Sequence, residues 1–134
     1  MNNLDIAAAP FKFMSSHRDD IYEPLAKNER TCIMFSNKSD TMMVAFAIGF
    51  HVNGRKKPGE DGKAINHVNL TSFPMEAREV IIALVQKRHP EAVDADILWH
   101  LVEEYAEYGI VILNESIKRN NDLIIDDILG RIPR

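Results

Sequence analysis

Residues 42–50 read Met-Met-Val-Ala-Phe-Ala-Ile-Gly-Phe, and this stretch decides the fold. Its large apolar side chains recur every three or four residues, the spacing at which side chains share one face of an α-helix. Because nearly every position is apolar, we expect a helix that is buried on most sides and forms the centre of the core. Asn37 or Ser39 can cap its start, and Asn53-Gly54 marks its end.

Two amphipathic helices are expected downstream. Pro74 lies near the first turn of one helix, and Asp94 or Asp96 opens the other. Gly109 lies inside the second helix at a cost of about 1 kcal/mol relative to Ala, which suggests close contact with a neighbouring helix or a local bend. The first apolar stripe contains Ala77, Val80, Ile81, Leu84 and Val85, and the second contains Leu98, Leu101, Val102, Tyr105, Ile112, Leu113 and Ile117.

Shorter pieces are expected upstream. Ser15 or Ser16 can cap a helix, which Pro24 should kink or split because proline lacks the backbone N–H that a helix interior uses. Residues 31–35, Thr-Cys-Ile-Met-Phe, predict a short buried extended segment.

The chain has 134 residues, 46% of them hydrophobic and 27% charged, which suits one globular domain. We predict a mainly α-helical fold, a compact bundle of about four to five helices with one or two short extended segments, around residues 11–13 and 65–70. Residues 1–10 have no hydrophobic period and are expected to be a flexible leader, which leaves residues 11–134 as a single helical domain.

The net charge and the cysteine content limit the expected binding partners and the expected cellular compartment. The net charge is −4, from 16 Lys and Arg against 20 Asp and Glu, which disfavours non-specific nucleic-acid binding over the whole surface. The single cysteine, Cys32, favours a reducing compartment, and its apolar neighbours in the sequence indicate a buried, inert thiol.

The N-terminus does not read as a signal peptide, and the longest apolar run is too short to span a bilayer. A cytoplasmic location without membrane partners is therefore expected.

No catalytic site is predicted. The five histidines are scattered, and none is spaced with another His or with Cys32 as a pair of metal ligands. His100 and Glu104 share a helix face, but a surface hydrogen bond accounts for that spacing. Glu103, Glu104 and Glu107 are expected to form a solvated acidic face of the long helix. We therefore expect no enzymatic activity, no metal and no cofactor.

The one dense basic cluster consists of Arg55, Lys56 and Lys57, with Lys63, in a loop that contains Gly and Pro. Such a loop can contact phosphates, but no aromatic residue is interleaved to stack on bases, and neighbouring acidic residues dilute its charge. The sequence leaves open a DNA-binding loop and a merely solvated one.

Two motifs go beyond composition. The first comprises Met34-Phe35, Lys38, Asp40, Met43, Ala45, Ala47, Gly49-Phe50, Asn53-Gly54-Arg55-Lys56 and Pro58. The second comprises Glu103-Glu104-Tyr105-Ala106 and Gly109, followed by Ile110, Ile112 and Leu113. Together they resemble a family of small proteins that accompany bacterial DNA phosphorothioation (Dnd) gene clusters, with Glu107-Tyr108 in place of that family's Asn-Gly. The resemblance extends over residues 21–128 and implies a setting of DNA modification and defence, without implying an active site.

The leading functional hypothesis is a non-catalytic accessory or regulatory protein of a DNA-modification or anti-phage defence system. It would bind a larger protein through the surface of Tyr105 and Tyr108, or through an amphipathic segment at residues 122–129 that contains Ile125 and Leu129. The alternative is a small DNA-binding regulator that uses the basic cluster, and a hydrolase-like enzyme ranks last. Homo-oligomers remain compatible with the sequence.

Overall fold

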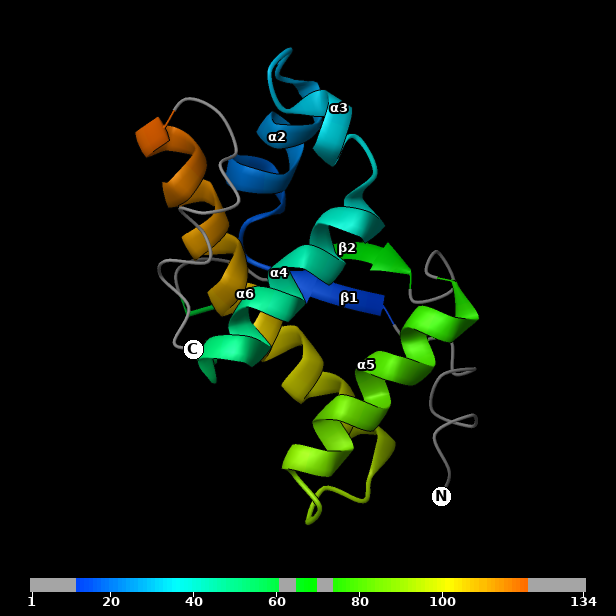
Figure 1. Cartoon of the computed structure of the whole chain (residues 1–134). Helices are drawn as coiled ribbons and strands as arrows, with labels where there is room; N and C mark the ends of the chain where they lie inside the picture. The colour runs from blue at the N-terminus through cyan, green and yellow to red at the C-terminus, as the bar shows by residue number, and fades with distance from the viewer. Residues whose placement is uncertain (1–11, 61–64, 70–73, 121–134) are drawn as a thin grey trace.

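The computed structural model describes residues 12–60, 65–69 and 74–120. This part of the chain is mainly helical, its helices pack against one another, and the predicted helical bundle is confirmed (Figure 1). The elements in chain order are β1 (Lys12–Ser15), the π-helical turn η1 (Arg18–Tyr22), α2 (Glu23–Lys27), α3 (Cys32–Phe35), α4 (Lys38–Val52), β2 (Ile65–Asn69), α5 (Met75–Arg88) and α6 (Ala95–Asn120).

Helix α4 begins and ends as its sequence predicts. The side chain of Asn37 accepts hydrogen bonds from the backbone N–H groups of Ser39 and Asp40, which satisfies donors that the first helical turn leaves open. At the other end Asn53 adopts the left-handed conformation, with φ of 54°, and the Gly54 N–H returns to the Gly49 carbonyl.

The pair of α4 and α6 is the centre of the molecule, and glycine lets the two backbones touch. A Cβ atom added at Gly49 would lie 1.9 Å from the carbonyl oxygen of Tyr105, and one added at Gly109 would lie 1.8 Å from that of Ala45. Of the two roles expected for Gly109, the structure shows close contact with a neighbouring helix. The crossing also brings together the two motifs that carry the family resemblance.

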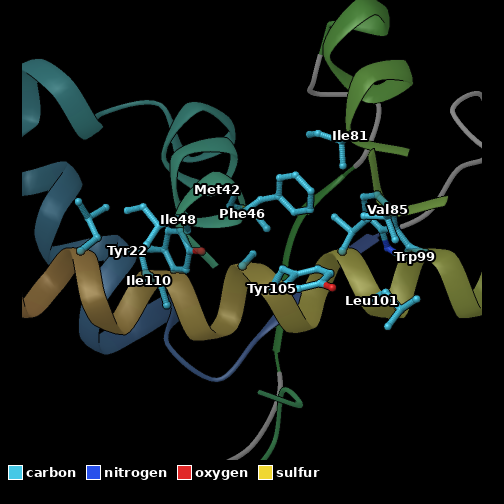
Figure 2. Close-up of a cluster of buried hydrophobic side chains, with 14 of the residues drawn as sticks. Tyr22, Met42, Phe46, Ile48, Ile81, Val85, Trp99, Leu101, Tyr105 and Ile110 are labelled. Atoms are coloured by element: carbon cyan, nitrogen blue, oxygen red, sulfur yellow. The ribbon is translucent and has the colours of Figure 1, made fainter. Parts of the chain in front are cut away.

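Tyr105 lies at the heart of this crossing. It is fully buried and lies beside Phe46 of α4 (Figure 2). Its ring packs edge-on against Phe46 and Phe50 of α4, with centroid separations of 6.1 and 5.2 Å. Its hydroxyl pairs with His89 Nε2 at 2.6 Å and donates to Asn53 Oδ1 at 3.3 Å. The expectation that Tyr105 belongs to a partner-binding surface is therefore wrong, because no part of the side chain reaches solvent.

Helix α5 buries a different face from the predicted one. Ile81, Ile82 and Val85 are buried, whereas Val80 and Leu84 are 58% and 40% exposed. The apolar run from residue 80 to residue 85 fits more than one helical register, so packing on α6 selects the buried face. That face is rotated from the predicted stripe by one position, about 100°.

The predictions for the short elements are confirmed in part. The extended segments are present, and β1 pairs antiparallel with β2 in a two-stranded sheet. Residues 31–35 are not a buried strand, because α3 forms a helical turn there that leaves Ile33 87% exposed. Cys32 is half-buried, so its thiol is less enclosed than predicted. Pro24 lies in the first turn of α2, directly after the π-helical turn, and the helix is divided as expected.

Some predictions fall outside the described residues, namely those for residues 1–10, for Lys63 and for residues 122–129. Within the described ranges, no helix combines the length and the apolar character that crossing a bilayer requires.

Candidate functional site

Helix α6 is covered on two opposite sides. Positions 103 and 105 differ by about 200° around a helix, so Glu103 faces almost directly away from Tyr105 and from α4. Strand β1 packs against this second side, and both Glu103 and Glu107 are buried, at 3% and 2% exposure. The expected solvated acidic face is therefore wrong for these two residues, since a strand about 90 positions away in the sequence covers them.

The buried carboxylates hold β1 and the residues after it. Glu103 Oε2 accepts the Met14 N–H at 2.6 Å. Glu107 accepts the Ser15 hydroxyl at 2.6 Å and the Ser16 N–H at 2.9 Å. We call Glu103, Glu107 and residues 14–16 the carboxylate junction. A buried carboxylate is costly unless donors surround it, and here the donors come from backbone and hydroxyl groups.

Burial raises the pKa values of one group of the carboxylate junction, Glu103, and of Tyr22, which feels the charge of Glu107. Burial raises the pKa of Glu103 to about 7; the Met14 N–H opposes this shift, and the charges of Glu107 and Glu104 add to it. Burial, with a contribution from the charge of Glu107, also raises the pKa of the Tyr22 hydroxyl. A carboxyl group with this pKa is half protonated near neutral pH, a property that structural and catalytic carboxyl groups can share.

The basic cluster does not stand apart from this acidic region. The Lys56 N–H donates to the Glu104 carbonyl at 3.0 Å, and the Arg55 guanidinium lies 3.8 Å from the Glu104 carboxylate. The Gly59 N–H donates to Ser16 Oγ at 2.6 Å, which ties the loop to the carboxylate junction. The sequence predicts a basic loop and an acidic helix face as separate features, but the fold joins them.

A cavity of about 470 Å³ opens where these segments meet. Its lining consists of Met14, Lys57, Pro58, His100, Glu103 and Glu104. Acidic and basic groups both line it, and Glu103 already accepts a hydrogen bond from β1. Among the described residues, no cluster of three or more His, Cys, Asp or Glu side chains is arranged to hold a metal ion.

A second hollow has the opposite character. Helices α4 and α5 both pack against α6 but scarcely approach each other through their backbones. Between them runs an apolar groove of about 530 Å³. Its walls are Met43, Phe46, Ala47, Phe50 and His51 from α4 and Glu76, Ala77, Val80, Ile81 and Leu84 from α5. We call this set the apolar groove.

The sequence-predicted binding residues are dispersed by the fold. Arg55 and Lys57 are exposed beside the carboxylate junction, and Lys56 is half-buried there. Tyr108 is 40% exposed and packs against Gly54. Lys63, Ile125 and Leu129 lie outside the described residues. The prediction missed Glu103 and Glu107 as buried ligands of β1, although apolar Ala106 and Ile110 on the same side of α6 signal a second buried face.

Comparison of the chain with protein-family models, with curated proteins and with solved structures finds no match. The resemblance to the phosphorothioation-associated family therefore stays a prediction.

Proposed function

We propose that this protein is a non-catalytic accessory or regulatory protein of a bacterial DNA-modification or anti-phage defence system, in the cytoplasm. In this proposal it acts by protein–protein interaction with a larger component of that system. The setting rests on the resemblance of the two sequence motifs. The mode of action rests on one observation, the apolar groove with the exposed side chains of Val80 and Leu84 on its wall.

The carboxylate junction supports this proposal over a catalytic one. Both buried glutamates are engaged by donors from residues 14–16, which gives their burial a structural reason. The Met14 N–H that Glu103 accepts holds β1 on α6, so the burial of this carboxyl group has a structural role that requires no substrate.

The alternative, a small DNA-binding regulator, receives less support from the geometry. Arg55 lies beside Glu104, and the cavity next to Lys57 also contains Glu103, so negative charge surrounds the cations that would meet phosphates. A gel shift at low salt tests this alternative directly. DNA binding that disappears when Arg55, Lys56 and Lys57 are neutralised would support it.

The proposed function is tested in the native host with a tagged copy of the gene. We expect the protein to co-purify with a larger protein encoded in the same modification or defence cluster, and its deletion to lower DNA phosphorothioation or resistance to phage. If deletion changes neither property and no component of the cluster is recovered, the proposed function is wrong.

A further inference from the structure

The apolar groove has the shape of a binding site for one more helix. Its α4 wall uses positions 43, 46, 47 and 50, and its α5 wall uses positions 77, 80, 81 and 84. Each set follows the three- and four-residue spacing of a helical stripe, so two apolar stripes face the same hollow. An amphipathic helix is the element that buries two such stripes at once.

The groove also has charged ends of opposite sign. Arg88 lies next to the groove residue Phe50, with its guanidinium carbon 3.5 Å from the centroid of the Phe50 ring, and exposed Lys87 precedes it in the sequence. Glu76 lines the other end, and exposed Asp40 lies on the same face of α4 as Met43. A bound segment is therefore complementary when it carries acidic groups near Arg88 and basic groups near Glu76.

We propose that the apolar groove binds an amphipathic helix of a partner protein, apolar along one stripe, acidic at one end and basic at the other. This inference rests on the proposed function, because it names the kind of element through which the larger partner is recognised. The negative carboxyl-terminal end of the helix dipole meets Arg88 and Lys87, so the bound helix runs parallel to α4 and α5. It forms a further layer on the bundle, with α4 and α5 beneath it.

The test uses the full-length protein and a labelled synthetic peptide of about four helical turns. The peptide carries Leu at i, i+3, i+4 and i+7, Lys in its first turn and Glu in its last. A control peptide has the same composition without the stripe. Fluorescence anisotropy should give a dissociation constant on the order of micromolar for the first peptide and markedly weaker binding for the control, since a single helix buries a small interface.

The matched protein variants locate the site. Val80→Asp and Leu84→Asp place a charge on the groove wall at exposed positions, and each should weaken peptide binding roughly tenfold or more. Ile97→Asp, also at an exposed apolar position but outside the groove, should leave binding unchanged. Lys87→Glu should weaken binding a few-fold and reduce its salt dependence. Circular dichroism confirms that each variant is folded.

Several outcomes would overturn the inference. Equal binding of the two peptides, or unchanged binding to Val80→Asp and Leu84→Asp, rules out the groove as the seat. Self-association that Leu84→Asp abolishes identifies a second copy as the occupant instead. Binding that appears only in the Ile125→Asp variant identifies the chain's own residues 122–129 as the occupant.

Co-purification, peptide binding and gene deletion together distinguish a wrong binding site from a wrong proposed function. If the groove variants still co-purify with the larger host protein, the function stands and the groove is not its contact. If the peptide binds the groove but the gene has no effect on modification or defence, the inference stands and the function is wrong.

Discussion

The carboxylate junction and the apolar groove use side chains in opposite ways. At the junction, charged residues that usually face water are buried, and donors from β1 and the next residues occupy their oxygens. At the groove, apolar residues that usually lie in the core remain exposed, and α4 and α5 leave space between them. Unusual burial therefore marks a structural joint at the carboxylate junction, whereas unusual exposure marks the surface through which we propose that a partner binds.

Gly109→Ala is expected to have the largest effect, because it acts on the α4–α6 crossing that supports both regions. The added methyl group would lie 1.8 Å from the Ala45 carbonyl oxygen, so the helices must separate. We expect a loss of about 3 kcal/mol or more in the free energy of unfolding, despite the better helix propensity of Ala. Urea denaturation measures this loss.

Gly54→Ala is the matched control for that change. The methyl group added there meets the ring of Tyr108, an exposed side chain that can turn away. Its cost should stay below about 1 kcal/mol. If Gly109→Ala lowers the free energy of unfolding as little as Gly54→Ala does, the α4–α6 crossing is looser than the structure indicates.

Glu107→Ala breaks the junction alone. It leaves the buried Ser15 hydroxyl and the Ser16 N–H without their acceptor, and we expect a loss of about 2–3 kcal/mol in the free energy of unfolding. Hydrogen exchange should show faster exchange of the β1 amides, with α5 little changed. Glu107→Gln keeps one acceptor oxygen and should lose less. A stability unchanged in both variants would mean that the carboxylate does not hold β1.

The two regions also differ in how far the sequence predicts them. Helices α4, α5 and α6 follow from local periodicity, whereas α3 was wrongly predicted as an extended segment. For Gly109 the sequence predicts either a close helix contact or a bend, and the packing of α6 on α4 selects the contact. The groove was missed because residues 80–85 are all apolar, and only packing on α6 decides which of them are buried. The carboxylate junction was missed because β1 and its contacts on α6 are about 90 residues apart in the sequence. No local pattern in β1 indicates that it packs against so distant a helix.

Glu103→Gln tests how the raised pKa of the buried Glu103 carboxyl group affects stability. The folded-state pKa of Glu103 is raised to about 7 from its ordinary 4.5. Between these two pH values the native state therefore keeps a proton on Glu103 that the unfolded chain has released. Its contribution to stability is present below pH 4.5 and is lost as the pH rises through 7. The variant cannot ionise, so its stability relative to the wild type should rise by about 3 kcal/mol across this window, since each pKa unit corresponds to about 1.4 kcal/mol.

Urea unfolding of both proteins between pH 4.5 and 8 measures this difference, and the charges common to the two proteins cancel in it. Parallel stability curves for the wild type and Glu103→Gln would show that burial does not perturb this carboxyl group.

The smallest effect on stability is expected at the groove. Val80 is 58% exposed, so Val80→Ser removes little buried apolar area and should change the free energy of unfolding by less than about 0.5 kcal/mol. Ile82→Ala, two positions along the same helix but fully buried, should cost about 2–4 kcal/mol. If Val80→Ser destabilises the protein as much as Ile82→Ala does, the groove wall is part of the core. A near-neutral Val80→Ser would instead separate the groove from the junction, because polar substitution at the groove would leave the fold intact and affect only what binds there.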